Sequence, residues 1–352
     1  MSVAQLYYDS YTIFLARRRR GGDRPRGPHH GTSRRVDISL DMSAAAFARR
    51  AISSFRVSAS RTVVRRVGTA PVARMSTGTS IDVTTPFCAL IQGAARGQGL
   101  ELARQLIERD SEVFGGRAAG GVVVATCRDP ANASELNALA AKHRGRVRVV
   151  RVDAADEASM KAAVEIVEKE IGRLDFMANV SAVLTEGKMR PETSINRTEA
   201  EHMLRAYTVN AVGPTMMMKH FSPIMLKTAE INSKEGGNGG VPVIANWSAR
   251  VSSIGDNALG GWHSYRGSKT ALNQLTRNCS IEFSRKKHPI IAMCVHPGTV
   301  DTKLSEPFKK NVPADKLFTP EYSVQRLLEV IGGATLEQSG NLYDYAGAKI
   351  DW

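Results

Sequence analysis

Paired cysteines, acidic residues near the N-terminus and long apolar runs are all scarce in this chain of 352 residues. Its four cysteines form no C-x-x-C pair and no His/Cys spacing that fits zinc, so the sequence predicts no metal site. We expect buried, reduced thiols that act as small hydrophobes at Cys88, Cys127, Cys279 and Cys294. No apolar run reaches the ~18 residues that a membrane span needs, so we expect no membrane-spanning helix.

Positive charge is concentrated at the start of the chain. Residues 1–80 hold fifteen arginines, no lysine and four acidic residues, a net charge of +11. The remaining residues hold 33 basic and 30 acidic side chains, a net charge of +3. Because a nucleic-acid-binding protein needs a basic stripe on its folded surface, this distribution argues against nucleic acid as a partner of the body.

Residues 1–80 have the composition of a transit peptide, and we expect them to be disordered or cleaved. Beyond Met42, the side chains of Phe47, Ile52 and Phe55 could share one helical face with arginines around it. We hypothesise that Met42 is the true start or an alternative one. The arginine density favours the mitochondrion over the plastid. If the leader is only a basic tail, a cytoplasmic location is expected.

From about residue 85 to residue 352, apolar strands alternate with amphipathic helices. This pattern predicts an α/β fold, a doubly wound parallel sheet (Rossmann fold) forming a single domain behind the leader. The expected strands are Pro86–Gln92, Gly121–Cys127, Val147–Val152, Leu174–Val180, Val241–Trp247, Pro289–Val295 and Asn341–Tyr345. The expected helices are Gly97–Asp110, Asn132–His143, Ala158–Ile171, a long helix within Glu199–Leu226, Ser264–Ser284 and Pro320–Ile331. The glycine-rich segments Phe114–Gly121 and Ser233–Gly240 are interpreted as surface loops.

A glycine-rich turn joins the first strand to the first helix. Gly93, Gly97 and Gly99 stand where the backbone must turn sharply and approach a pyrophosphate closely. The N-terminus of the following helix would offer free N–H groups to the phosphates. The strand before and the helix after the turn make a dinucleotide site a better interpretation than a plain glycine turn.

Two arginines bear on which dinucleotide is bound. Arg96 lies inside the glycine loop, and Arg128 follows the second strand, where an NAD-specific site usually has an acidic residue. An arginine can pair with a 2′-phosphate through its fork of donors. We therefore predict a preference for NADP(H), with NAD(H) possible. The alternative is that either arginine is only a solvated loop residue.

A tyrosine and a lysine lie one helical turn apart, at Tyr265 and Lys269. A tyrosine with a pKa near 10 is a poor acid–base group at neutral pH. A nearby lysine favours the phenolate, so we expect it to move the tyrosine pKa toward the working range. The pair follows the fifth of six strands behind the glycine turn, and this position makes it more specific than a chance YxxxK.

Together these motifs resemble the short-chain dehydrogenase/reductase family over about residues 85–352. The resemblance rests on the glycine turn, Asn210, the Tyr265–Lys269 pair and the Pro297-Gly298 motif that ends at Thr302. Within the family the chain resembles C-factor-like proteins and sniffer-type carbonyl reductases. That closer resemblance is carried by Ile254–Tyr265, Ser268–Asn273 and His296–Phe308.

The resemblance implies a role for each matching residue. Tyr265 would be the general acid/base, Lys269 would lower its pKa and bind ribose, and Asn210 would anchor a water for a proton relay. The cofactor-binding set would be Gly93, Arg96, Gly97, Gly99, Arg128, Asp153 at the adenine, Asn179 on the adenosine side, Tyr265, Lys269, Pro297, Gly298 and Thr302 at the carboxamide. It also implies a homo-oligomer, a dimer or tetramer, with Glu199–Leu226 and Ser264–Ser284 as candidate interfaces.

Two positions depart from the family pattern. Ala182 replaces a glycine after the fourth strand, and Ala249 replaces the serine that polarises the substrate carbonyl. An alanine cannot donate a hydrogen bond, so another serine must take over if the chain is active. Ser248 needs the smallest move in sequence, and Ser252 and Ser253 are the alternatives.

The leading hypothesis is an NADP(H)-dependent oxidoreductase that transfers hydride between nicotinamide and a carbonyl or alcohol of a small organic molecule. The alternative is a cofactor-binding regulatory or signalling protein with little turnover, which Ala249 and Ala182 favour. The segment Lys303–Phe318 is expected to be the substrate loop. Its aromatic residues are compatible with a partly apolar ligand, and a solvated loop or an interface between subunits explains them at least as well.

Overall fold

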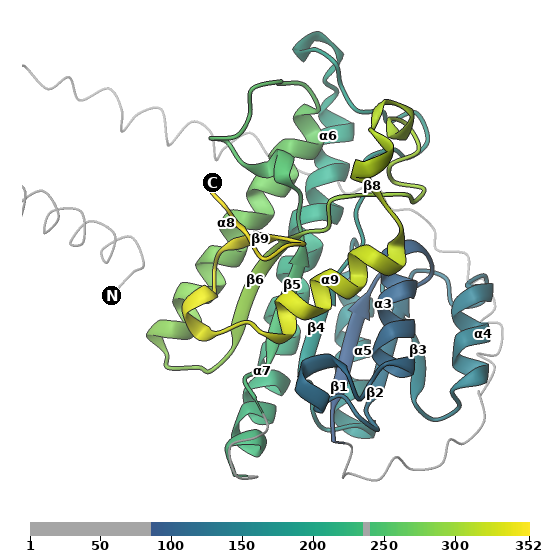
Figure 1. The fold of residues 1–352 in the computed structure, drawn as a ribbon, viewed down its shortest axis with the longest axis vertical. Helices are drawn as coiled ribbons and strands as arrows, with labels where there is room; N and C mark the ends of the chain where they lie inside the picture. Colours follow the sequence, from purple (N-terminus) through teal and green to yellow (C-terminus); the bar gives the residue numbers. More distant parts are fainter. Residues whose placement is uncertain (1–85, 235–239) are drawn as a thin grey trace, which may run out of the picture. The chain divides into compact units, whose positions relative to one another are not determined.

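A computed structural model describes residues 86–234 and 240–352, which contain one large parallel sheet (Figure 1). Its eight strands run in the order β10-β9-β6-β5-β4-β1-β2-β3, and every pair is parallel except β9 with β10. The strands are β1 (Cys88–Gln92), β2 (Val122–Cys127), β3 (Val147–Arg151), β4 (Phe176–Asn179), β5 (Val243–Trp247), β6 (Ile291–His296), β9 (Leu342–Asp344) and β10 (Lys349–Ile350). This order confirms the predicted doubly wound sheet.

Helices cover both faces of the sheet. The helices are α3 (Gly97–Glu108), α4 (Ser134–Lys142), α5 (Glu157–Glu170), α6 (Ala200–Tyr207), α7 (Gly213–Lys234), α8 (His263–Arg285) and α9 (Pro320–Gly332). Residues of α3, α4 and α9 share one core with alternate strand residues, and residues of α5, α7 and α8 share the other. Along β1, for example, Ala89 belongs to the first core and Leu90 to the second. Figure 1 shows α3 and α9 on the near face.

The predicted elements are confirmed with shifted ends, and three details differ. The helix expected within Glu199–Leu226 is two α-helices joined by a π-helical turn, Thr208–Val212, and α7 continues to Lys234. The prediction that Phe114–Gly121 is a surface loop is wrong for Phe114, because its side chain is buried between the rings of Phe87 and Phe176. Two short strands, β7 (Thr299–Val300) and β8 (Leu317–Phe318), pair with each other at the two ends of the segment after the Pro-Gly motif.

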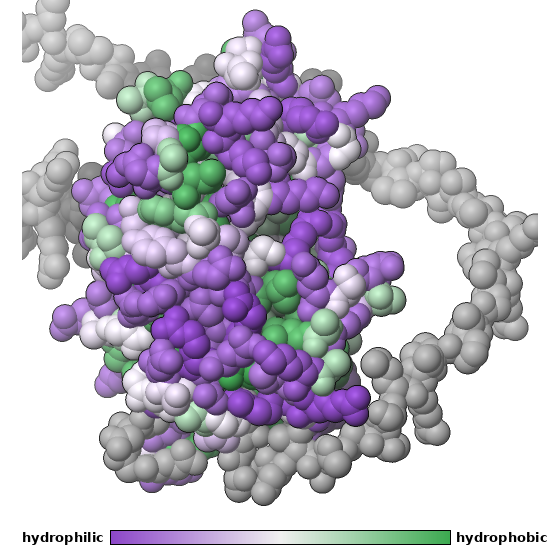
Figure 2. Space-filling view, turned by 45° about the vertical axis from the view of Figure 1, so that its right-hand side comes forward, coloured by the Kyte–Doolittle hydropathy of each residue, from purple (hydrophilic) through white to green (hydrophobic). Residues whose placement is uncertain are grey.

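Figure 2 shows a face on which hydrophilic residues surround small, separate hydrophobic patches. The expected burial of the cysteines is confirmed for Cys88, Cys127 and Cys294, while Cys279 is partly exposed. Among the described helices, none combines the length and apolarity needed to cross a bilayer. The predicted leader, residues 1–80, lies outside the described residues.

Candidate active site

The glycine turn after β1 is tightly packed, as the sequence predicts. Gly93 and Gly97 have positive φ angles of 96° and 56°, which favour glycine. A Cβ on Gly93 would lie 2.7 Å from the Cβ of Ser181, and one on Gly99 would overlap the carbonyl oxygen of Gly93. The first helical turn of α3 carries no acidic residue, and the side chain of the N-cap residue, Arg96, makes no capping hydrogen bond. Its N–H groups are therefore free to meet a phosphate.

The parallel topology brings the predicted cofactor residues to one edge of the sheet. Arg128 follows β2 and is exposed, Asp153 follows β3 and is half-buried, and Asn179 ends β4. Asn179 is 1% exposed, and its Nδ2 donates to Oδ1 of Asn246 at 2.7 Å. Its own Oδ1 is buried and has no hydrogen-bond partner among the described residues. A buried acceptor left in this state needs a donor, which a bound ligand can supply.

The Pro297-Gly298 motif after β6 faces the glycine turn. A Cβ built on Gly97 would lie 3.5 Å from Cγ2 of Thr302, so these two predicted cofactor residues lie next to each other. Gly298 has a φ of 77°, and a Cβ there would lie 2.5 Å from the ring of Phe318. The hydroxyl of Ser323 on α9 donates to the carbonyl of Pro297 at 2.7 Å, which ties the motif to that helix.

Tyr265 and Lys269 lie on the buried side of α8. Nζ of Lys269 is 5.9 Å from the centre of the Tyr265 ring and donates to the backbone carbonyl of Trp247 at 2.5 Å. Burial lowers the pKa of Lys269 to about 8, and the interaction with Cys294 opposes this shift. Burial also raises the pKa of Tyr265 above its usual range. The predicted lowering of the tyrosine pKa by the lysine is not found in this structure, because desolvation disfavours the phenolate and raises the pKa instead.

Asn210 occupies the π-helical turn and is fully buried. Its Nδ2 donates to the carbonyl of Val183 at 2.9 Å and to Oγ of Ser268 at 3.0 Å, and its Oδ1 accepts from Val183 N–H at 2.7 Å. Asn210 thus links the chain after β4 to the residue directly before Lys269. This contact places the predicted relay residue beside the lysine segment.

The three candidate serines differ in how their hydroxyl hydrogens are used. Ser248 donates to Oδ1 of Asn273 at 2.6 Å, and Ser252 donates to the carbonyl of Ala249 at 2.6 Å. Ser253 only accepts, from the N–H of Asp256 at 3.1 Å, so its hydroxyl hydrogen has no acceptor among the described residues. Ser248 and Ser252 are held by the structure, whereas Ser253 keeps a donor available.

An aromatic group lies beside the tyrosine. The ring of Trp262 meets that of Tyr265 edge-on at 6.2 Å and packs on Phe308 at 5.0 Å. Trp262 has a φ of 51° and stands at the N-cap of α8 without capping it by its own side chain. Phe308 belongs to the predicted substrate loop, so the loop and the tyrosine share this apolar contact.

Sequence reasoning missed a buried glutamate that caps α8. The carboxylate of Glu192 accepts from the hydroxyl of Ser264 and, at 3.3 Å, from its backbone N–H. The carbonyl of Glu192 accepts from Trp262 N–H at 2.6 Å. No local signal marks this residue, since it lies 72 positions before Ser264.

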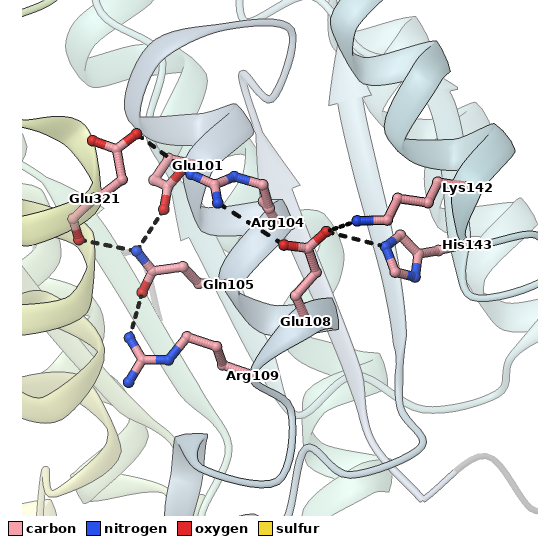
Figure 3. Close-up of polar contacts among 8 residues, drawn as sticks. All are labelled: Glu101, Arg104, Gln105, Glu108, Arg109, Lys142, His143 and Glu321. Atoms are coloured by element: carbon pink, nitrogen blue, oxygen red, sulfur yellow. Dashed lines mark hydrogen bonds and ion pairs between the residues drawn. The ribbon is translucent and has the colours of Figure 1, made fainter.

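A groove of about 470 Å³ between α3, α4 and the start of α9 lies apart from this chemistry. Figure 3 shows a polar network at and beside this groove, in which Glu108 meets Arg104, Lys142 and His143, and Gln105 meets Glu101 and Glu321. Only Gly97 belongs both to the groove and to the glycine turn. The tyrosine and lysine therefore remain the candidate active site, and this groove is not part of it. Among the described residues, no group of three or more His, Cys, Asp or Glu side chains is arranged to hold a metal ion.

Comparison with known proteins agrees with this geometry. Residues 88–313 match the family described as short chain dehydrogenase. The C-signal protein of Myxococcus xanthus is 29% identical over 150 residues, which cover 43% of this chain and 78% of that protein. An NADPH-bound carbonyl reductase structure from chicken fatty liver is 28% identical with a TM-score of 0.64, covering 76% of this chain and 99% of that one. The carbonyl reductase Sniffer of Drosophila melanogaster has the same fold at 23% identity, with a TM-score of 0.64 and coverage of 76% and 100%.

Proposed function

The chain belongs to the short chain dehydrogenase family, and from that premise we propose that it is an NADP(H)-dependent oxidoreductase acting on a carbonyl or alcohol of a small organic molecule. The observation that carries this proposal is the buried Tyr265–Lys269 pair on α8, in a fold whose glycine turn opens at the same edge of the sheet. The NADPH-bound carbonyl reductase among the similar structures supports it.

The residues present fit a nicotinamide dinucleotide. The glycine turn has no room for a Cβ at two positions, the N-terminus of α3 is uncapped, and Oδ1 of Asn179 is a buried acceptor in need of a donor. We assign the pyrophosphate to the glycine turn and the adenosine to Asp153 and Asn179. Arg96 and Arg128 would bind the 2′-phosphate, which favours NADP(H) over NAD(H). Thr302 would bind the carboxamide.

The bound nicotinamide supplies the hydride, and the chain's own residues manage the proton. Tyr265 donates a proton to the alkoxide that forms when a carbonyl is reduced, or accepts one from an alcohol in the reverse direction. Lys269 binds the ribose hydroxyls, and its positive charge favours the phenolate that remains. Asn210 orients the segment that carries Lys269 through Ser268.

A donor for the substrate carbonyl is needed because Ala249 cannot supply one. We propose Ser253 for this role, since its hydroxyl hydrogen has no acceptor among the described residues while those of Ser248 and Ser252 are already donated. A donor aimed at the developing oxyanion contributes about 10²-fold or more to the rate.

The proposed substrate is partly apolar. Trp262 and Phe308 form an apolar wall next to Tyr265. The aromatic or alkyl group of a carbonyl substrate would pack against this wall and be buried.

Cofactor titration followed by turnover tests the proposal. Residues 76–352 and the full chain would be titrated with NADPH and NADH, then supplied with aldehydes, ketones and quinones, with Tyr265→Phe as the control. We expect tighter NADPH binding, oxidation of NADPH, and loss of turnover in Tyr265→Phe without loss of cofactor binding. Tight binding without turnover on any carbonyl would instead favour the regulatory alternative, for which the similarity to the C-signal protein is a second argument.

We further propose that residues 1–80 direct import into the mitochondrion. The support is their composition, with fifteen arginines and four acids. Fusing residues 1–80, or residues 42–80, to a fluorescent protein tests this. Import of both fusions supports Met42 as a start, and a diffuse cytoplasmic signal from both contradicts the proposal.

A homo-oligomer is proposed as well. Ile195, Leu204 and Val212 are exposed large apolar residues near or within the predicted interface helix, and Ile281 is exposed on α8. Light scattering of the wild type and of Leu204→Glu tests this. A dimer or tetramer in the wild type that becomes smaller in Leu204→Glu supports the proposal, and a monomeric wild type contradicts it.

A further inference from the structure

An exposed glutamate holds the arginine that the proposed function assigns to the 2′-phosphate. Nη1 of Arg128, after β2, lies 3.4 Å from Oε1 of Glu186, in the chain between β4 and α6. The same carboxylate accepts two hydrogen bonds from Arg205 on α6, at 2.5 Å from Nε and 3.0 Å from Nη2. The segment after β2, the segment between β4 and α6, and α6 itself are thus joined through one carboxylate.

The two arginines are held unequally. The pair with Arg205 is bidentate and short, and the Arg205 side chain is 31% exposed. The pair with Arg128 is a single long contact, and the Arg128 side chain is 58% exposed. Bidentate arginine–carboxylate pairs are stronger than single exposed contacts. Arg128 is therefore the partner that can leave.

The charges around Glu186 also indicate that it holds Arg205 more firmly than Arg128. The hydrogen bond from Arg205 lowers the pKa of Glu186 below its usual value, so the carboxylate is ionised at neutral pH. The pKa of Arg205 is raised by Glu186 and, more weakly, by Asp153. Arg205 thus stays charged on Glu186 and neutralises much of the negative charge that a phosphate approaching Arg128 would meet.

We propose that Glu186 is a specificity-determining residue, which holds Arg128 when no cofactor is bound and competes with the 2′-phosphate for it, while Arg205 weakens this competition. The inference rests on the proposed NADP(H) preference. Neither Glu186 nor Arg205 touches the phosphate. Removing Glu186 should therefore strengthen NADPH binding, and removing Arg205 should weaken it. The affinity for NADH, which has no 2′-phosphate, should not change in either case.

Fluorescence titration of the full chain with NADPH and NADH tests this in three variants. Glu186→Gln frees Arg128, and its NADPH Kd should fall by about two- to fivefold, the range of an exposed ion pair. Arg205→Gln leaves Arg128 as the only cation on Glu186, and its NADPH Kd should rise by about the same factor. The double variant should match Glu186→Gln alone, because Arg205 acts only through the carboxylate. The NADH Kd should not change in any of them.

The matched control is Glu108→Gln, at the far end of α3 from the glycine turn. Glu108 is also a carboxylate with several cationic partners (Figure 3), and its loss should leave both Kd values unchanged. An unchanged NADPH Kd in Glu186→Gln, or equal shifts for NADPH and NADH, overturns the proposal. So does an Arg205→Gln effect that persists in the Glu186→Gln background, because that arginine would then act on the phosphate directly.

Arg128→Gln separates this inference from the proposed function. Loss of the NADPH preference in Arg128→Gln supports the cofactor assignment, and a null result for Glu186→Gln then overturns only the role of Glu186. An unchanged NADPH preference in Arg128→Gln overturns the role of Arg128 and, with it, that of Glu186, and leaves Arg96 as the phosphate ligand of the proposed function.

Discussion

Glu192 binds both the backbone N–H and the hydroxyl of Ser264, the residue directly before the proposed catalytic Tyr265. Ser264 lies in the first turn of α8, whose N-terminal N–H groups need acceptors. Because Trp262 at the N-cap supplies no side-chain acceptor, a residue from the segment between β4 and α6 does so instead. Glu192 therefore sets where α8 begins and, with it, where Tyr265 lies.

Removal of this cap should slow turnover more than it weakens cofactor binding. We expect Glu192→Ala to lower kcat by about 10- to 100-fold, because a small displacement of a catalytic group is costly in rate. Glu192→Gln, which keeps an acceptor oxygen, should recover part of the loss. Steady-state kinetics with NADPH titration measure both effects, with the exposed Glu337→Ala as the control. A wild-type kcat in Glu192→Ala would rule out the positioning role.

The three serines should separate into one catalytic and two structural residues. Ser253→Ala should lower kcat by about 10²-fold with little change in thermal stability. Ser248→Ala and Ser252→Ala each leave a buried group without a partner, so they should lower the free energy of unfolding by about 1–3 kcal/mol. Kinetics and thermal melts of the three variants decide this. The assignment fails if Ser248→Ala loses turnover and Ser253→Ala keeps it.

Cofactor binding should weaken as the pH rises through the pKa of Lys269, which burial lowers to about 8. Below this pH the lysine is protonated and donates charge-assisted hydrogen bonds, and above it the charge is lost. Such bonds are worth about 1.5–3 kcal/mol, so the NADPH Kd should rise by about tenfold or more between roughly pH 7 and 9.5. The Lys269→Met variant should bind weakly at every pH. Lys142→Met, at an exposed lysine on α4, should keep the wild-type profile, and a flat wild-type profile would contradict the assignment.

Acid should destabilise the protein through His296. Burial, aided by the charge of Arg250 and opposed by Asp344, lowers its pKa from 6.5 to about 4. Between these two values the unfolded chain binds a proton that the folded protein does not, so stability falls as the pH drops through this window. His296→Gln should flatten the dependence of Tm on pH there. An unchanged slope in that variant would show that other groups cause the acid sensitivity.

Much of the fold could be predicted because its signals are local. The alternation of apolar strands with amphipathic helices predicted the sheet, and the glycine spacing at Gly93, Gly97 and Gly99 predicted the turn that packs too tightly for side chains. Buried Phe114 was missed because it stands among glycines, and a glycine-rich segment has the composition of a surface loop. The π-helical turn around Asn210 was also missed, since helical periodicity does not register one extra residue in a turn.

The sequence by itself determined the secondary elements, their order and the spacing of Tyr265 and Lys269, because each depends on residues within a few positions of one another. Only the tertiary structure decided that Asn273 takes the hydroxyl hydrogen of Ser248, that Glu192 caps α8, and that Glu186 joins Arg128 to Arg205. These contacts join residues 25, 72, 58 and 19 positions apart. Charge and hydrogen-bonding capacity are visible in a sequence, but which partner satisfies them is set by how the elements pack.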